Sequence, residues 1–275
     1  MLTHAEMTTH GLPHADDVWH GVGVTDRGRV RTSNQDAFAI LNECGVWIVA
    51  DGMGGRAGGD IASRITVDGV ADELFQRLGT SLSDSTEIQS RSDLLHQVVH
   101  RSNKAVREEA SRHPELLGMG TTLVVLMILP RPQPTALIAH VGDSRTYCLR
   151  SGVLTQVTRD HSFVEESLRN GLLTEAEAVD HPMRHVLTRA VGAELEVETE
   201  ITIHALAPQD ILLLCTDGLT KMLPDRIVRD ILSQPAALPR QMCQALVNEA
   251  NARGGEDNTT VVLVRKELTK SHQER

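Results

Sequence analysis

The sequence predicts an α+β fold in which many short strands are joined by few helices. Eight segments of about five to nine residues are rich in aliphatic and β-branched side chains, whereas three longer segments have the spacing of an amphipathic helix. The helical segments do not alternate one for one with the strands, which argues against a doubly wound parallel sheet. With 275 residues, 40% of them apolar, the chain can bury a substantial core.

The strand candidates are 46–50, 122–129, 135–141, 145–150, 153–158, 198–206, 211–215 and 259–265. The segment PRPQP at 130–134 lies between two of them, and we interpret it as a hairpin connection rather than as a polyproline ligand. Residues 161–189 interrupt the strand series with short helical and polar pieces. An insertion of this size in a compact domain indicates a functional loop or lid.

Three segments predict amphipathic helices, at 58–78, about 88–112 and about 239–252. The first carries apolar residues three to five positions apart, namely Ile61, Ile65, Val70, Leu74 and Leu78. Gly79 follows this helix, and glycine is favoured just past a helix C-terminus. We expect residues 1–17 to form a disordered leader, 18–268 a single domain, and 269–275 a short tail.

Composition and charge limit the classes of partner that the protein is expected to bind and the cellular compartment in which it is expected to work. Lys and Arg number 27 against 37 Asp and Glu, so the net charge of −10 repels nucleic-acid phosphates. No apolar run approaches the roughly 20 residues that span a bilayer, and no secretory signal is visible at the start. The four cysteines form no C-x-x-C pair, which favours buried thiols in a reducing compartment. We therefore expect a cytoplasmic protein that binds neither nucleic acid nor membrane.

Aspartates stand where the apolar runs end or begin. They are Asp51 after 46–50, Asp143 after 135–141, Asp217 after 211–215 and Asp257 before 259–265. If these strand ends lie on one side of the sheets, the carboxylates converge in one cleft and repel each other unless a cation intervenes. Mg²⁺ and Mn²⁺ prefer such oxygen ligands. For any single aspartate, plain turn chemistry is an equally good interpretation, because Asp-Gly is a common turn dipeptide.

Two further segments carry residues suited to binding anions. The run DGMGGRAGGD at 51–60 supplies glycines that let the backbone approach a ligand, but no G-K-[ST] follows, so it is not a Walker loop. Upstream, Arg29 and Arg31 precede Asp36, and the planar guanidinium group suits phosphate oxygens. Judged alone, two exposed arginines at a strand end are the simpler interpretation.

Six segments together resemble one known family. In chain order they are TDRGRVRTSNQDAF, VADGMGGRAGGDIAS, MGTTLVV, HVGDSRTY, CTDGLT and GGEDNTTVVLV. Over roughly residues 18–267 the chain is similar to the bacterial metal-dependent type 2C (PPM-type) serine/threonine protein phosphatases. The resemblance implies that 18–268 is the catalytic domain and that 161–189 is the family's mobile flap. It also implies a four-layer α-β-β-α sandwich, with two antiparallel sheets flanked by helical layers and the active site at one end.

The resemblance assigns metal-binding roles to individual residues. Asp51 would bridge two Mg²⁺ or Mn²⁺ ions, and Gly52 would contribute its carbonyl oxygen to one of them. Asp217 and Asp257 would hold the other ion. Asp143 and Asp217 match acids that hold a third, weaker metal in several members of the family.

Arg31 and Asp36 complete the implied catalytic site, together with Asp51. Arg31 would clamp the substrate phosphate, and Asp36 would hydrogen-bond a metal-bound water. Three positions depart from the family pattern. Met53 replaces the histidine proposed as general acid in the animal enzymes, and Gln35 replaces a metal-binding glutamate of some members. Lys221 stands where some members have an acid that helps to hold the third metal.

The implied reaction is direct hydrolysis of phosphoserine and phosphothreonine on proteins by a hydroxide that bridges the two ions, without a phosphoenzyme. The leaving oxygen would take its proton from a metal-bound water or from His161, although a plain loop role is the simpler expectation for His161. The implied partners are phosphorylated protein substrates and a cognate serine/threonine kinase, and we expect a monomer. Two alternatives stay open: a catalytically weak binding or regulatory module, and a phosphatase for other substrates such as small phosphate esters.

Overall fold

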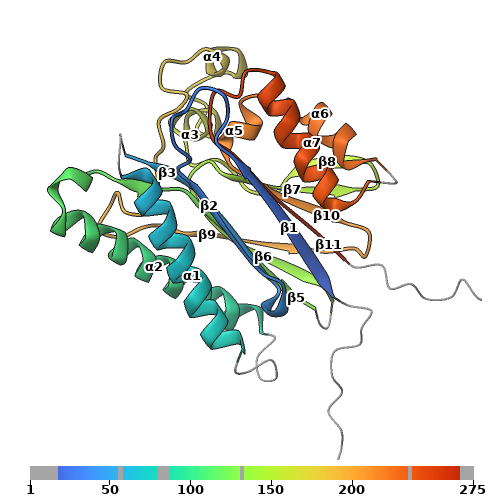
Figure 1. The fold of residues 1–275 in the computed structure, drawn as a ribbon, viewed down its shortest axis with the longest axis horizontal. Helices are drawn as coiled ribbons and strands as arrows, with labels where there is room; N and C mark the ends of the chain where they lie inside the picture. The colour runs from blue at the N-terminus through green and yellow to red at the C-terminus, as the bar shows by residue number, and fades with distance from the viewer. Residues whose placement is uncertain (1–17, 55–57, 80–86, 131–132, 235–236, 267–275) are drawn as a thin grey trace, which may run out of the picture.

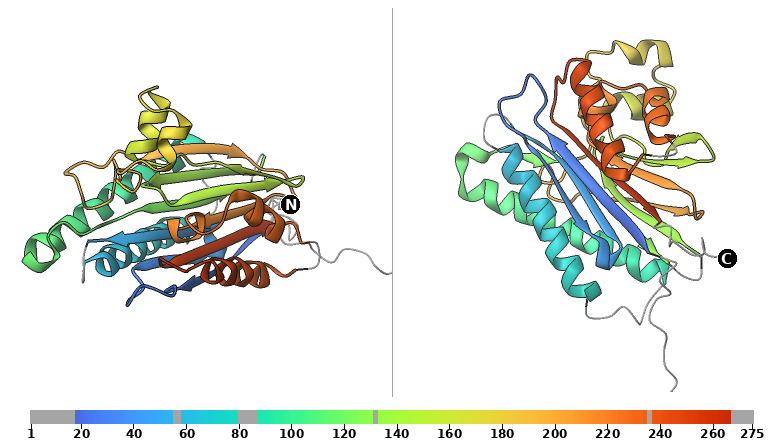
Figure 2. Two further views of the ribbon diagram at one scale, coloured as in Figure 1. Left: turned by 90° about the horizontal axis from the view of Figure 1, so that it is seen from above. Right: turned by 45° about the vertical axis from the view of Figure 1, so that its right-hand side comes forward.

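Two antiparallel sheets pack face to face, and helices cover the outer face of each sheet (Figures 1 and 2). The structure is a computed structural model that describes residues 18–54, 58–79, 87–130, 133–234 and 237–266. The expected four-layer α-β-β-α sandwich is confirmed. The expected leader at 1–17 and tail at 269–275 lie outside the described residues.

The first sheet has the strand order β1-β11-β10-β7-β8. Its strands are β1 (Trp19–Asp26), β7 (Arg145–Arg150), β8 (Val153–Gln156), β10 (Ile211–Cys215) and β11 (Thr259–Lys266). Two helices cover its outer face, α6 (Asp225–Leu232) and α7 (Pro239–Ala252), and a one-turn helix, α5 (Asp217–Thr220), follows β10. Val228 of α6 and Leu246 of α7 are buried in one cluster with Leu213 of β10.

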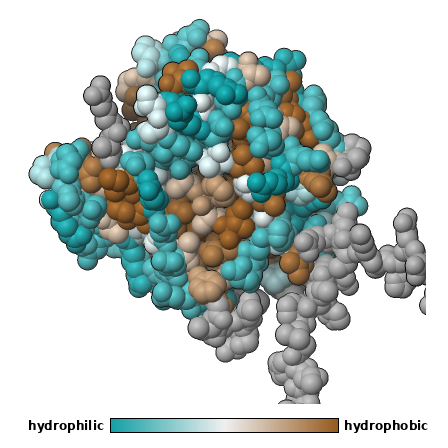
Figure 3. All heavy atoms as spheres, in the orientation of Figure 1, coloured by the Kyte–Doolittle hydropathy of each residue, from teal (hydrophilic) through white to brown (hydrophobic). Residues whose placement is uncertain are grey.

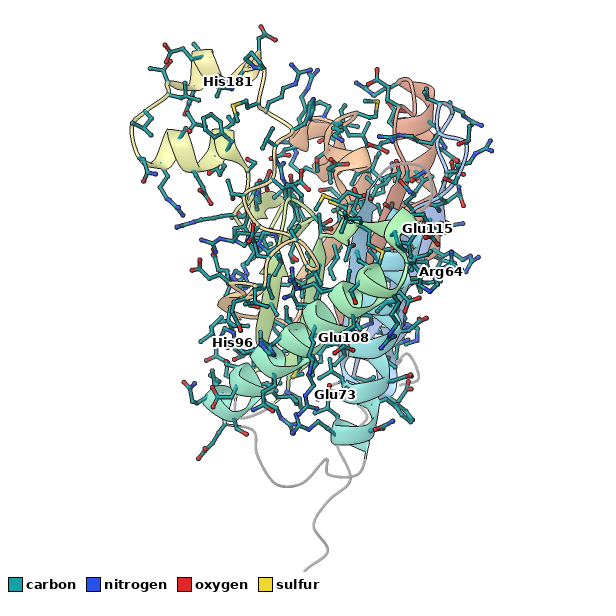
Figure 4. The ribbon with its side chains drawn as sticks, turned by 90° about the vertical axis from the view of Figure 1, so that its left-hand side faces the viewer. Arg64, Glu73, His96, Glu108, Glu115 and His181 are labelled. Carbon is teal, nitrogen blue, oxygen red and sulfur yellow. The ribbon has the colours of Figure 1, made fainter. Side chains whose placement is uncertain are left out.

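The second sheet has the order β2-β3-β5-β6-β9. Its strands are β2 (Asp36–Leu41), β3 (Val46–Met53), β5 (Leu123–Leu129), β6 (Thr135–Val141) and β9 (Glu200–Ala205), and the short β4 (Gly120–Thr121) pairs with β3. The helices α1 (Gly59–Gly79) and α2 (Ile88–Arg112) cover this sheet. Figure 4 shows them lying side by side, with the labelled side chains Arg64, Glu73 and Glu108 on them.

The central strands are buried on both faces, which explains why they appear in the sequence as continuous apolar runs. Along β3, Val46, Ile48 and Ala50 belong to the core beneath α1 and α2, whereas Trp47 and Val49 belong to the core between the sheets. This division follows from the alternation of side chains along a strand. Burial of both faces makes β3 a rigid support for the residues at its end.

The three helices agree with the sequence prediction to within about one residue. The strands β5 and β6, on either side of the predicted connection at 130–134, pair antiparallel, and residues 131–132 of this connection lie outside the described residues. The sequence patterns do not predict β1, β2 or α6. The first two are edge strands with partly exposed side chains, so their hydrophobic signal is weak. Figure 3 shows a more hydrophobic strip between the two helical layers, where Figure 1 places these two strands.

The insertion at 161–189 forms α3 (Phe163–Arg169) and α4 (Glu175–Val179) above one end of the sandwich (Figure 1). Its two ends are joined, because Thr188 N–H donates to His161 C=O at 2.9 Å and Phe163 N–H donates to Val186 C=O at 2.9 Å. The labelled His181 lies on this flap, away from α1 and α2 (Figure 4). Within the described residues, no helix is both long and apolar enough to cross a bilayer.

Packing of the sheets against each other predicts opposite effects for two Gly→Ala substitutions. A Cβ at Gly21 would lie 2.0 Å from Trp47 Nε1, whereas a Cβ at the exposed helical Gly69 meets nothing nearer than 3.8 Å. We expect Gly21→Ala to lower the free energy of unfolding by about 1–3 kcal/mol. Gly69→Ala should raise it by about 0.5–1 kcal/mol, because alanine favours the helix. Urea unfolding of both variants measures this, and equal effects would contradict it.

Candidate active site

The aspartates at the strand ends line one cavity of about 680 Å³ beside the flap. The structure brings most of the expected site residues to its wall, namely Arg31, Asp51, Gly52, Asp143, Asp217 and Asp257. Asp36 does not line the cavity. The predicted convergence of strand-end carboxylates is therefore present in the fold.

Antiparallel pairing brings these residues together, because the end of one strand lies beside the start of its neighbour. Cys215 at the end of β10 pairs with Val261 near the start of β11, and the next residue, Thr216, donates its N–H to Thr260 C=O at 3.0 Å. A Cβ at Gly218 would lie 1.9 Å from the Asn258 carbonyl oxygen. The loops that carry Asp217 and Asp257 are thus in direct backbone contact.

Asp51 and Gly52 lie inside β3 rather than after it, because β3 extends to Met53 by pairing with β4. The Asp51 carbonyl accepts hydrogen bonds from Thr121 Oγ1 at 2.8 Å and from Thr122 N–H at 2.9 Å. Any larger residue at position 52 would clash, since a Cβ there would lie 1.9 Å from the Gly59 carbonyl oxygen. The backbone of both candidate ligands is therefore fixed by the sheet and by the start of α1.

Asp36 lies opposite Asp51 in the β2–β3 pair, behind the cavity wall. Its Oδ2 accepts hydrogen bonds from Thr260 Oγ1 at 2.7 Å and Thr216 Oγ1 at 2.9 Å. Its Oδ1 is buried and has no hydrogen-bond partner among the described residues. Burial raises the pKa of Asp36 to about 7, against the effect of these hydrogen bonds, and nearby Asp217 adds to the rise.

Asn258 clamps the loop that carries Arg31. Its Oδ1 accepts from Gln35 N–H at 2.9 Å, and its Nδ2 donates to the carbonyls of Arg27 and Ser33 at 2.8 and 2.9 Å. The sequence patterns do not predict this role. A buried asparagine directly after Asp257 was the available signal, but Asn-Thr at the start of a strand is too common to single out.

The donor set fits a hard divalent cation. Burial and the charges of Asp36, Asp217 and other acids raise the pKa of Asp51 well above its usual value. Burial, with Asp217 and Asp160, also raises the pKa of Asp143 to about 7. In addition, Asp217 Oδ1 is buried without a hydrogen-bond partner in the described part of the chain. Clustered carboxylates with unused oxygen lone pairs are the environment that Mg²⁺ and Mn²⁺ stabilise.

Two side-chain cations contact the same acids. Lys221 Nζ lies 2.5 Å from Asp217 Oδ2 and 3.1 Å from Asp257 Oδ2. Arg31 binds Asp257 through both Nε and a terminal nitrogen, each at 2.9 Å. Although burial alone would lower it, Asp217 and Asp257 raise the pKa of Lys221 above its usual value. The expected phosphate-binding Arg31 therefore lines the cavity while paired to a candidate metal ligand.

His161 does not line the cavity, so it is not placed to protonate a leaving group there. It is 3% exposed, its Nδ1 accepts from Gly142 N–H at 3.1 Å, and its Nε2 lies 3.3 Å from Glu200 Oε2. His161 therefore lies at the base of the flap.

Three further residues line the cavity. Met53 offers no proton, and His185 and Arg189 come from the flap. The sequence patterns do not predict a site role for His185 or Arg189, because this segment contains several basic residues and histidines and no pattern distinguishes one of them.

A second group of potential metal ligands lies outside this cavity. Cys148, His204 and Asp210 place one ligand atom each within 4.8 Å of one another. Both Asp210 oxygens, however, accept from Arg150, at 2.8 and 2.5 Å, and one also accepts from Ala207 N–H at 2.8 Å. With a guanidinium group on its carboxylate, this cluster is a structural anchor between the sheets.

Comparisons with known proteins identify a family to which this chain is similar. The sequence profile of the family described as protein phosphatase 2C matches residues 25–256. The serine/threonine phosphatase stp of Listeria monocytogenes is 40% identical over 248 residues, which cover 89% of this chain and 95% of that protein.

Solved structures give the same result. The serine/threonine phosphatase of S. agalactiae is 35% identical and superimposes with a TM-score of 0.81, covering 90% of this chain and 100% of that one. The catalytic domain of the phosphatase PstP, solved in complex with two manganese ions, is 31% identical with a TM-score of 0.75, covering 90% of this chain and 98% of that one. This chain therefore belongs to the protein phosphatase 2C family.

Proposed function

We propose that the cavity at the end of the sandwich is the active site, in which Asp51, Gly52, Asp217 and Asp257 hold two Mg²⁺ or Mn²⁺ ions. By its family, the protein is a metal-dependent serine/threonine protein phosphatase. The observation that carries the assignment is the convergence of these aspartates, from strands far apart in the sequence, on one cavity, where the buried Asp217 Oδ1 has no hydrogen-bond partner among the described residues. The two manganese ions of the related PstP structure support it.

The proposed division of labour follows from the contacts of each residue. The ions, when bound, supply a hydroxide nucleophile from water near neutral pH. Arg31, half exposed at the cavity wall, can exchange its carboxylate partner for phosphate oxygens, which its planar fork fits equally well. Asp36, held through Oδ2 by two threonines, keeps Oδ1 available to accept a hydrogen bond from a water beside Asp51.

A third, weaker ion would depend on Asp143 and Asp217. Both also line a smaller hollow next to the main cavity, together with Lys221 and the partly buried ion pair of Arg145 with Asp160. Because Lys221 replaces an acid here, the third ion would have fewer anionic ligands than the first two. We propose that the third site binds its ion more weakly than the first two sites bind theirs.

The proposed partners are phosphorylated proteins and a serine/threonine kinase whose action the enzyme reverses. All four cysteines are free thiols, which supports a reducing, cytoplasmic location. The net charge of −10 would speed the approach of basic substrates, as a salt-dependent effect on rate. We propose that the enzyme acts as a monomer.

Removal of the proposed bridging ligand tests the function. Asp51→Asn should lower Mn²⁺-dependent hydrolysis of a phosphothreonine peptide by at least about 10²–10³-fold, because it removes a charge on which the ions depend. Asp60→Asn is the matched control, since Asp60 is a partly exposed acid paired with Arg64 outside the cavity lining. Full activity in Asp51→Asn, or none in the wild type with Mn²⁺, would contradict the proposal. Preference for a small ester over phosphopeptides would favour the alternative substrate class.

The phosphate-binding role of Arg31 predicts a change mainly in substrate binding. Arg31→Ala should raise KM for a phosphopeptide by roughly 10–100-fold, which corresponds to the loss of charge-assisted hydrogen bonds to phosphate. Arg29→Ala, at a neighbouring arginine outside the cavity lining, should leave KM within about twofold of the wild type. Steady-state kinetics at saturating Mn²⁺ measures both variants. An unchanged KM in Arg31→Ala would exclude the phosphate clamp.

The buried acids predict how the stability of the metal-free protein varies with pH. Folding raises the pKa of Asp36 and Asp143 to about 7, whereas the pKa of aspartate in an unfolded chain is about 3.9. Between these values the folded state binds more protons than the unfolded state, so stability falls as pH rises. In chelator, the melting temperature should drop by on the order of 5–10 °C from pH 5 to pH 7.5, and less in Asp36→Asn. A melting temperature that rises over this pH range would contradict the raised pKa values of these two acids.

A further inference from the structure

We propose that Lys221 is a tethered counter-ion that competes with a metal ion for Asp217 and Asp257, and so sets how tightly this phosphatase holds that ion. The inference rests on the proposed assignment of these two aspartates as metal ligands. It concerns a residue at which this chain departs from the acid of some family members.

The geometry places one ammonium group between two carboxylates. Lys221 Nζ contacts Asp217 Oδ2 at 2.5 Å and Asp257 Oδ2 at 3.1 Å. The position follows from local structure, because Lys221 lies four residues after Asp217, and its N–H donates to the Asp217 carbonyl at 2.8 Å. One helical turn therefore carries the lysine side chain back over the aspartate.

The ammonium and a metal ion need the same two carboxylates. Asp257 is already shared, since Arg31 binds both of its oxygens at 2.9 Å, and Asn258 N–H donates to its Oδ1 at 3.0 Å. At Asp217 a divalent ion can use Oδ1, which has no hydrogen-bond partner among the described residues. At Asp257 both oxygens are in use, so an ion there would have to displace Lys221 or Arg31 and would also meet the repulsion of the Lys221 charge. Lysine suits this exchange, because its ammonium is a point charge on a flexible stem, and 30% of the side chain is exposed to solvent.

The ion pairs of Lys221 with Asp217 and Asp257 are also buried enough to affect the binding of a metal ion. The Asp217 and Asp257 side chains are only 17% and 15% exposed, so the attraction is screened less than in a surface pair. Without metal, the ammonium offsets the repulsion among the clustered acids. With metal, the same positive charge opposes binding. Loss of the charge should therefore strengthen metal binding and weaken the metal-free fold at the same time.

The test is a Mn²⁺ titration of the metal-stripped full-length protein by calorimetry, at fixed ionic strength and without substrate. In Lys221→Met, we expect the Kd of at least one Mn²⁺ site to fall by about tenfold or more, and the melting temperature in chelator to fall as well. Lys221→Arg keeps the charge and should stay within about threefold of the wild-type Kd. Lys104→Met is the matched control, because Lys104 pairs with Glu108 at 3.7 Å on the exposed side of α2.

A purely structural lysine would lower the melting temperature without tightening any Mn²⁺ site, and this outcome would overturn the inference. Lys221→Gln loses the charge but keeps a hydrogen-bond donor, and it replaces the methionine variant in the titration if that variant does not fold. Asp217→Asn separates this inference from the site assignment. Mn²⁺ binding that Asp217→Asn leaves unchanged would overturn both. Binding that Asp217→Asn weakens, with an unchanged Kd in Lys221→Met, would overturn only the role of Lys221.

Discussion

The mutual repulsion of aspartates held at the ends of buried strands is the constraint on which the rest of this molecule depends. Asp51, Asp143 and Asp217 cannot move apart, because β3, β6 and β10 are fixed by packing on both faces. A cluster of this kind needs positive charge, and the cavity offers room for divalent ions beside Asp217 Oδ1, which no group of the described residues uses. Metal dependence thus follows from the way the strands end.

Neutral groups around the aspartates keep the geometry fixed before any ion binds. Threonine hydroxyls hold Asp36 and the backbone of Asp51, and Asn258 ties the Arg31 loop to the start of β11. Such fixed surroundings reduce the reorganisation needed when charge develops in a reaction. The protein's own cations are more adaptable, since Arg31 and Lys221 both pair with Asp257 through exposed or half-exposed side chains. The site therefore combines rigid anions with movable cations.

The sequence predicts the inner parts of this architecture better than its edges. Continuous apolar runs predict β3 and β5 because both faces of these strands are buried, whereas β1 and β2 lie at sheet edges and carry a weaker signal. The aspartates were found because each follows or precedes an apolar run. The pairing of Lys221 with two of them, and the approach of His185 from the flap, depend on tertiary contacts that no local pattern records.

Anomalous X-ray diffraction at the manganese edge, from crystals grown with Mn²⁺, would locate the ions relative to the aspartates. We expect two peaks about 3.5–4 Å apart, both within coordination distance of Asp51, with Asp217 and Asp257 on one of them. The absence of peaks in this cavity, or a peak only at Cys148, His204 and Asp210, would contradict this expectation.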